Sequence, residues 1–300
     1  MKYDHIFGLV GNTPHVRIRA DEVPKANLYL KLEGQNPTGS VKDRPCIHLL
    51  GNAVKEGRLK AGRTILDASS GNMACALAFF GKIMGYPVKV IANAGLTEDK
   101  AAFITYFGAE LVRFGGRTID GNHHCRRLQS ENPHTYCFLD QFHNWDNPNA
   151  HYQSTGPEIY RDFPRLAMVV ASIGSGGTLT GTGRYLKEHL PAVKIAAVQS
   201  AKGSKLPGTG AFEDGDFMTP FLRQGREDGL IDFDAKITLE AAVSGTARLR
   251  DQGFFCGIQT GGVFRGALEI IKRQGIEGDV VLISGDSGWK NMQMLTEADL

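Results

Sequence analysis

The residues best suited to chemistry lie in positions 36–45, which read Asn-Pro-Thr-Gly-Ser-Val-Lys-Asp-Arg-Pro. The Pro and Gly predict a turn, Ser40 is a candidate cap, and Lys42 then falls in the first turn of a helix. The N–H groups at a helix start carry partial positive charge, which disfavours a second cation there. We therefore expect the neutral amine of Lys42 to be favoured, and such an amine forms Schiff bases with carbonyl compounds. A solvated surface lysine is the alternative interpretation.

A second candidate site is the run Ser69-Ser70-Gly71-Asn72, which follows a short apolar segment and begins a helical pattern. Backbone amides and small hydroxyls at a helix start form a cradle for a carboxylate or a phosphate. An ordinary capped helix start explains the same run equally well.

A third candidate site is a glycine-rich loop with a hydroxyl residue at its end, Gly174-Ser175-Gly176-Gly177-Thr178. Such a loop lets several N–H groups approach an oxyanion closely. It is not a dinucleotide fingerprint, because Leu179 stands where G-x-G-x-x-G requires its last glycine. We therefore predict a monophosphate ligand here. Ser287, in a later Gly-rich turn, either bonds a ligand edge or serves only the turn.

Alternating strand and helix patterns position these sites. This alternation predicts an α/β protein with parallel sheets covered on both faces, in which ligands bind at the carboxyl ends of strands. Residues 201–224, rich in Gly, Pro and charge, are expected to be a mobile active-site loop. The predicted strands are 27–32, 64–67, 87–91, 110–114, 166–172, 194–198 and 279–284, and the predicted helices include 73–84, 98–107, 179–189, 239–252 and 262–274.

Composition narrows the class of protein. The 300 residues carry 34 basic and 32 acidic side chains, a net charge of +2, so no nucleic-acid partner is expected. The five cysteines are odd in number and lack metal-binding spacing, and we interpret His123-His124-Cys125 as surface and core positions of a helix, so no metal site is predicted. Without a signal region or an apolar span, the chain is expected to be cytoplasmic and free of membrane.

Taken together, the motifs resemble the cysteine synthase (O-acetylserine sulfhydrylase) and cystathionine β-synthase family of fold-type II pyridoxal phosphate enzymes. The resemblance covers nearly the whole chain. Three segments, 36–45, 178–184 and 286–290, resemble most the O-phosphoserine-using branch of the family. It implies a tryptophan synthase β-like fold of two parallel-sheet α/β domains with the cofactor between them. The smaller, mobile substrate-binding domain would be 40–142, and the larger cofactor-binding domain 1–39 plus 143–300. The matching motifs are 11–14, 31–45, 69–72, 151–158, 174–183 and 285–290.

Carried over by position, the resemblance makes Lys42 the Schiff-base lysine and general base. Asn72 would bond the phenolic oxygen of pyridoxal 5'-phosphate, and Ser287 would face its pyridine nitrogen. The substrate carboxylate would contact Ser69, Ser70, Gly71, Met73 and Gln141, and the cofactor phosphate Gly174, Ser175, Gly176, Gly177 and Thr178.

The sequence departs from the family pattern at three places. Met73 replaces a threonine in the carboxylate loop, so one hydroxyl is lost. Gln259 replaces a serine that faces the pyridine nitrogen in some members, so either Gln259 or Ser287 could serve. The phosphoserine-using branch has an arginine where Ala201 stands, so Lys202 or Lys205 would have to supply the charge.

The implied reaction is β-replacement on O-acetylserine or O-phosphoserine by a transferase of the EC 2.5.1 type. Lys42 removes the α-proton, the β-substituent leaves to give an aminoacrylate, and a nucleophile adds to yield cysteine or another β-substituted alanine. The alternatives are dehydratase-type β-elimination from serine or threonine, and a non-catalytic binding subunit. The resemblance further implies a homodimer in amino-acid biosynthesis. Sulfide or a sulfur-carrier protein could deliver the nucleophile, which the sequence leaves open.

Overall fold

A computed structural model describes residues 2–298 of the chain. By the packing of its Cα atoms, the chain separates into two compact units. Unit 1 consists of the described residues up to Val41 and from Pro148 onward, and unit 2 is Lys42–Asn147. The helix α5 (Asp146–Gln153) runs across the second boundary.

Unit 1 is built on a six-stranded sheet with the order β1-β2-β10-β7-β8-β9. Every neighbouring pair is parallel except β1 with β2, which pair antiparallel with Val16 opposite Leu30. The short link between β1 and β2 explains this exception, because a parallel partner would need a long crossover connection. The strands are β1 (His15–Ile18), β2 (Ala26–Leu32), β7 (Met168–Ser172), β8 (Lys194–Ser200), β9 (Phe233–Ile237) and β10 (Gly278–Ser284).

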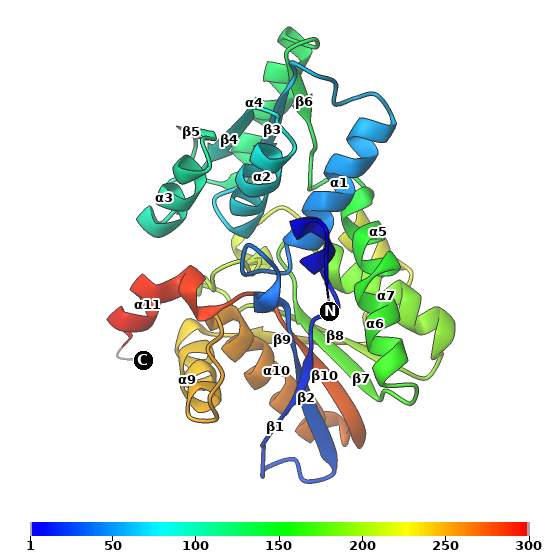
Figure 1. Ribbon diagram of the computed structural model, residues 1–300. Coiled ribbons are helices and arrows are strands. Elements are labelled where there is room, and N and C mark those ends of the chain that lie inside the picture. The colour runs from blue at the N-terminus through cyan, green and yellow to red at the C-terminus, as the bar shows by residue number, and fades with distance from the viewer. Residues whose placement is uncertain (1, 299–300) are drawn as a thin grey trace. The chain divides into compact units, whose positions relative to one another are not determined.

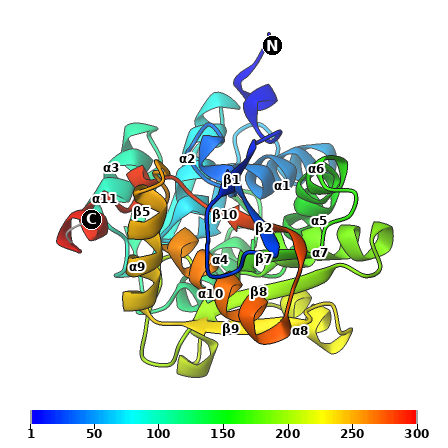
Figure 2. The ribbon, with the colours of Figure 1, turned by 90° about the horizontal axis from the view of Figure 1, so that it is seen from below.

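Helices cover both faces of this sheet (Figure 1; Figure 2). The pair α9 (Leu239–Arg250) and α10 (Ile258–Gln274) lies on one side, and α6 (Thr155–Asp162) and α7 (Gly177–His189) lie on the other. Buried strands of a parallel sheet are apolar on both faces, as β7 and β10 are here. The remaining described helices of unit 1 are α8 (Pro220–Glu227), α11 (Met292–Glu297) and the short η1 (Ile6–Leu9), η2 (Glu33–Gln35), η3 (Phe212–Asp214) and η4 (Gly288–Asn291).

Unit 2 is built on a fully parallel sheet with the order β5-β4-β3-β6. Buried Leu66, Ala68, Ile91 and Cys125 form a core cluster between the sheet and α4. Its strands are β3 (Thr64–Ala68), β4 (Val88–Ala92), β5 (Glu110–Arg113) and β6 (Tyr136–Phe138), and its helices are α1 (Asp43–Lys55), α2 (Asn72–Ile83), α3 (Glu98–Tyr106) and α4 (Thr118–Glu131).

The predicted α/β class with parallel sheets is confirmed, and the seven predicted strands occur within about two residues of their expected bounds. The loop predicted at 201–224 contains η3 and the start of α8. Across residues 2–298, no helix combines the length and the apolar character needed to span a membrane.

Candidate active site

Lys42 lies at the head of α1, immediately before its first helical residue, Asp43. Its backbone is already helical, with φ −71° and ψ −14°, and its carbonyl accepts the first bond of the helix, from Cys46 N at 3.0 Å. The lysine therefore has the predicted place at a helix N-terminus. The residue directly before the helix is Lys42, and Ser40, two positions earlier, pairs through its backbone with Asp286.

The predicted carboxylate loop in unit 2 joins β3 to α2. Ser69 is buried and its Oγ accepts from Gly71 N at 3.2 Å, which turns the chain into the helix. Gly71 is the N-cap residue, and neither a capping side chain nor an acidic residue occupies the first turn of α2. The first N–H groups of any α-helix have no acceptor four residues earlier within the helix, and a helix start without an acidic residue suits an anion such as a carboxylate.

Gln141 lies beside this loop, within unit 2. Its Nε2 donates to Ala68 O at 2.9 Å, and its own carbonyl accepts from Asn147 Nδ2 at 2.8 Å. The structure thus brings Gln141 and the residue before Ser69 into direct contact, although 73 positions separate Gln141 from Ala68.

The carboxyl group of Asp67 binds both the start of this loop and the backbone of Gln141. Its Oδ1 accepts from Ala68 N at 2.7 Å and its Oδ2 from Gln141 N at 3.3 Å. Burial raises the pKa of Asp67 well above its usual range, and the nearby charge of Asp140 adds to the effect. Sequence analysis missed Asp67, because an acid at the end of an apolar strand gives no signal of which loop it will hold.

The remaining unit 2 candidates differ in exposure. Asn72 is the first residue of α2 and is half-buried, as are Ser70 and Gly71. Met73 is 2% exposed. Its apolar thioether stands where the family pattern has the hydroxyl of a threonine.

The predicted phosphate loop in unit 1 joins β7 to α7. Gly176 is the N-cap residue of α7 and has φ +85°, a conformation that favours glycine. No acidic side chain occupies the first turn, which contains Thr178. Ser175, just before the N-cap, accepts through Oγ from Gly177 N at 3.4 Å. A donor set of amides and hydroxyls without a carboxylate fits a phosphate dianion.

Neighbouring elements hold this loop closely. Thr219 Oγ1 donates to Ser175 O at 2.7 Å, and Thr178 Oγ1 lies 3.2 Å from Nε2 of buried His151. A Cβ added at Gly174 would lie 2.6 Å from Gly208 O, so part of the loop after β8 packs directly on the cradle. The contacts of Thr219 and Gly208 were not predicted, since only the fold brings these distant positions together.

Gln259 and Ser287 both lie in unit 1, on separate turns. Gln259, in the first turn of α10, accepts through Oε1 from Ser172 Oγ at 2.8 Å and lies close to the Cα of Gly285. Ser287 precedes η4, and its backbone N donates to Gly39 O at 3.0 Å. It also forms a backbone bridge with Cys256.

Lys202 is exposed on the loop after β8.

Two parallel-sheet α/β units, a glycine-rich helix start and a lysine at the head of another helix are the features expected of a pyridoxal-phosphate enzyme. The profile of one family, described as pyridoxal-phosphate dependent enzyme, matches residues 6–285. The chain therefore belongs to this family and has the fold-type II architecture, as the motifs predicted. It is a pyridoxal-phosphate-dependent transferase of the cysteine synthase type.

Individual relatives support this narrower assignment. The chain is 37% identical over 276 residues to cysteine synthase B of Pseudomonas aeruginosa, covering 90% of each chain. It superimposes on a solved structure of O-ureido-L-serine synthase with a TM-score of 0.88 and 28% identity, covering 97% of this chain and 94% of the other. The O-acetylserine sulfhydrylase isoform 3 of Entamoeba histolytica gives a TM-score of 0.86 at 27% identity, with 98% and 91% covered.

Proposed function

We propose that the protein catalyses β-replacement on an O-activated L-serine, with O-acetylserine as the first candidate, to give cysteine or another β-substituted alanine. The observation that carries this proposal is the position of Lys42 at the head of α1, in a chain whose α2 and α7 also begin with anion cradles. The names of its relatives, cysteine synthase B and O-acetylserine sulfhydrylase, support the same choice of substrate.

Lys42 carries the covalent link and the proton transfer in this proposal. When bound, pyridoxal phosphate withdraws electrons from an amino acid joined to it and so acidifies the α-carbon. Lys42 Nζ, once released from the cofactor, accepts the α-proton. The helix start disfavours a charged lysine, which assists this role as a base.

The substrate carboxylate is assigned to the first turn of α2 and to Gln141. Asp67 connects the two, because its carboxyl accepts from Ala68 N and from Gln141 N. A bound carboxylate would thus meet donors whose positions are already fixed, which lowers the entropic cost of orienting the substrate. Met73 would add apolar surface beside it and exclude water from that side.

The cofactor's phosphate is assigned to Gly174–Thr178. His151 supports this loop, since its Nδ1 lies 2.8 Å from Thr155 Oγ1 while its Nε2 lies 3.2 Å from Thr178 Oγ1. Asn72 is assigned to the cofactor's phenolic oxygen, and either Ser287 or Gln259 to its ring nitrogen. Lys202 is assigned to a charged leaving group such as phosphate.

We further propose that the smaller domain, predicted at 40–142, is the mobile, substrate-binding part, and that the enzyme is a cytoplasmic homodimer. Unit 2, Lys42–Asn147, covers nearly the same residues. Sedimentation of the purified protein tests the dimer. A sulfur-carrier protein is proposed as a partner only if free sulfide proves a poor nucleophile.

The first test is an absorbance spectrum of the purified protein and of a Lys42→Ala variant. We expect a visible band from the lysine-bound cofactor that is lost in Lys42→Ala. Lys55→Ala, at the exposed end of the same helix, is the matched control and should retain the band. A protein that never acquires a visible band would be a binding subunit and would contradict the proposal.

The second test adds O-acetylserine and O-phosphoserine separately and measures the β-substituted product formed with sulfide. Rapid cysteine formation from O-acetylserine supports the proposal. Efficient formation of pyruvate without any added nucleophile would favour β-elimination instead. Poor use of sulfide together with good use of a hydroxyl or amine nucleophile would place the protein nearer to O-ureido-L-serine synthase.

A further inference from the structure

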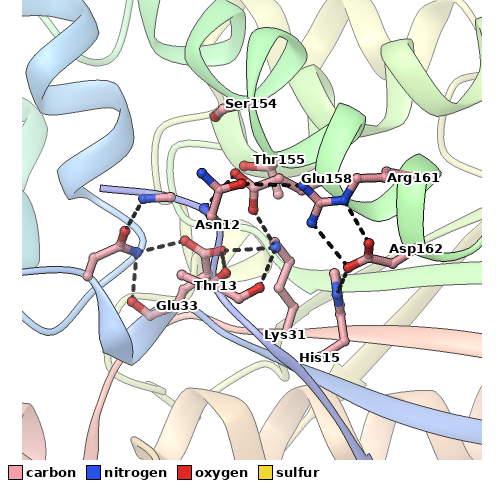
Figure 3. Close-up of polar contacts among 12 residues, drawn as sticks. Asn12, Thr13, His15, Lys31, Glu33, Ser154, Thr155, Glu158, Arg161 and Asp162 are labelled. Carbon is pink, nitrogen blue, oxygen red and sulfur yellow. Dashed lines mark hydrogen bonds and ion pairs between the residues drawn. The ribbon is translucent and has the colours of Figure 1, made fainter. Parts of the chain in front are cut away.

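Lys31, on β2 in unit 1, is completely buried, with 0% of its surface exposed. Its Nζ lies 2.6 Å from Glu158 Oε2 and 3.9 Å from Glu33 Oε1, and it donates to Thr13 O at 3.1 Å (Figure 3). A charged amine is stable in a protein interior only when it is paired and hydrogen-bonded in this way. Lys31 and Glu33 come from the consecutive elements β2 and η2, and Glu158 comes from α6, so the cluster joins this segment to a helix residue 127 positions from Lys31 in sequence.

The two carboxylates also fix the turn at residues 11–13. Glu158 Oε1 accepts from Asn12 N at 2.9 Å, and Glu33 Oε1 accepts from Thr13 Oγ1 at 2.7 Å. Gly11 and Asn12 both have positive φ, of 88° and 47°, which is costly for a non-glycine residue. The side chains around the turn therefore hold it in a conformation that the chain would not favour alone.

The same cluster fixes the segment that leads to Lys42. Glu33 Oε2 accepts from Asn36 Nδ2 at 2.8 Å, and Asn36 Oδ1 accepts from Gly11 N at 2.8 Å. Asn36 O then accepts from Gly39 N at 2.8 Å, which closes the turn of the Asn-Pro-Thr-Gly sequence.

The far end of this segment is attached to the turn that contains Ser287. Gly39 O accepts from Ser287 N at 3.0 Å, and Val41 N donates to Gly285 O at 2.8 Å. Val41 is bonded directly to Lys42 in the chain. Residues 36–41 are thus held at one end by the Lys31 cluster and at the other by residues 285–287.

We propose that Lys31 is a positioning residue for Lys42. With Glu33 and Glu158 it holds the backbone of residues 36–41, so that Lys42 is presented in one orientation for its covalent link to the cofactor. This inference rests on the proposed role of Lys42. It also gives a purpose to the motifs at 11–14, 31–33 and 156–158, for which the resemblance assigned no role.

The test compares full-length holoenzyme variants at a temperature well below unfolding. Lys31→Met removes the charge, and Lys25→Met is the matched control, because Lys25 forms an exposed ion pair with Glu277. After cofactor removal and return, we expect Lys31→Met to recover the visible band about 100-fold more slowly, since a misplacement of roughly 1 Å costs about that factor. Amide exchange of residues 36–41 in the folded holoenzyme should also become faster, and Lys25→Met should match the wild type in both.

A double variant keeps the test decisive if Lys31→Met does not fold. Lys31→Met with Glu158→Met replaces the pair by apolar side chains, which commonly preserves stability, while Asn12 N loses its acceptor. We expect the same slow recovery and the same faster exchange. Wild-type recovery and wild-type exchange in a folded variant would overturn the role of Lys31.

Borohydride reduction and peptide mapping separate this failure from a failure of the proposed function. If the cofactor is trapped on a lysine other than Lys42 in the wild type, the proposed function and this inference both fail. If it is trapped on Lys42 but both variants behave like the wild type, only the role of Lys31 is overturned.

Discussion

At the scale of single residues, His15 shows how burial decides the charge of a side chain. Its Nδ1 lies 2.8 Å from Asp162 Oδ2 (Figure 3). Its ring packs edge-on against Phe163. Its Nε2 is buried, with no hydrogen-bond partner among the described residues. Burial lowers the pKa of His15 to about 4, and the charge of Lys31 contributes, although Asp162 opposes the shift.

A pH dependence of stability follows from this shift. Between pH 6.5 and 4 the unfolded chain binds a proton at His15 that the folded protein does not, so stability should fall as pH falls through this range. The loss should amount to at most about 3 kcal/mol. His15→Gln keeps an N–H donor and does not titrate, so its urea midpoint should change less over the same range. Equal pH dependence in both proteins would show that other groups dominate.

At the scale of elements, α9 and α10 meet through glycines. A Cβ added at Gly261 would lie 2.1 Å from Ala242 O, and one added at Gly245 would lie 2.3 Å from Gly261 O. The two helices can approach this closely only because neither glycine has a side chain. Gly261 is two residues from Gln259, so the contact also fixes the first turn of α10.

Two glycine substitutions should therefore have opposite effects. Gly261→Ala must separate α9 from α10, and we expect it to lower the free energy of unfolding by about 1–3 kcal/mol or more. A Cβ added at Gly51, in α1, would meet no atom of the described residues within 4 Å beyond its chain neighbours and the nearby backbone of the helix itself. Gly51→Ala should therefore raise the stability of the helix by about 0.5–1 kcal/mol. Urea unfolding measures both, and a neutral Gly261→Ala would mean that the helices adjust without cost.

The elements also show which parts of the fold a sequence reveals. Long apolar runs such as those of β3, β7 and β10 were predicted, because buried parallel strands have few polar residues. The strands β1, β6 and β9 were not predicted, since they are short and partly polar and depend on a neighbouring strand for their order. The loops of the candidate site were proposed from their glycines and hydroxyls. Their supports, such as Asp67 and Thr219, depend on contacts that only the folded chain creates.

At the scale of the whole molecule, the residues proposed to hold the cofactor come from both units of the chain. Lys42 and Asn72 belong to unit 2, whereas the Gly174–Thr178 loop and Gln259 belong to unit 1. Each unit has buried hydrophobic residues of its own, such as Leu66 and Ile91 in unit 2 and Val170 and Phe264 in unit 1. A ligand that binds only the folded state stabilises whichever parts it touches, by about 2.7 kcal/mol when its concentration is 100 times its Kd.

Amide exchange with and without cofactor should therefore report protection in both units. We expect slower exchange at the start of α7 and also in the first turns of α1 and α2. In Lys42→Ala the protection of α7 should remain in part, because the proposed contact of its amides with the phosphate does not involve Lys42, while that of α1 should fall to the level without cofactor. The helix α3, to which no cofactor or substrate residue is assigned, serves as the internal control in every sample. Protection confined to unit 1 in the wild type would mean that the cofactor is bound without Lys42, because a covalent link at the head of α1 must slow the opening of that helix.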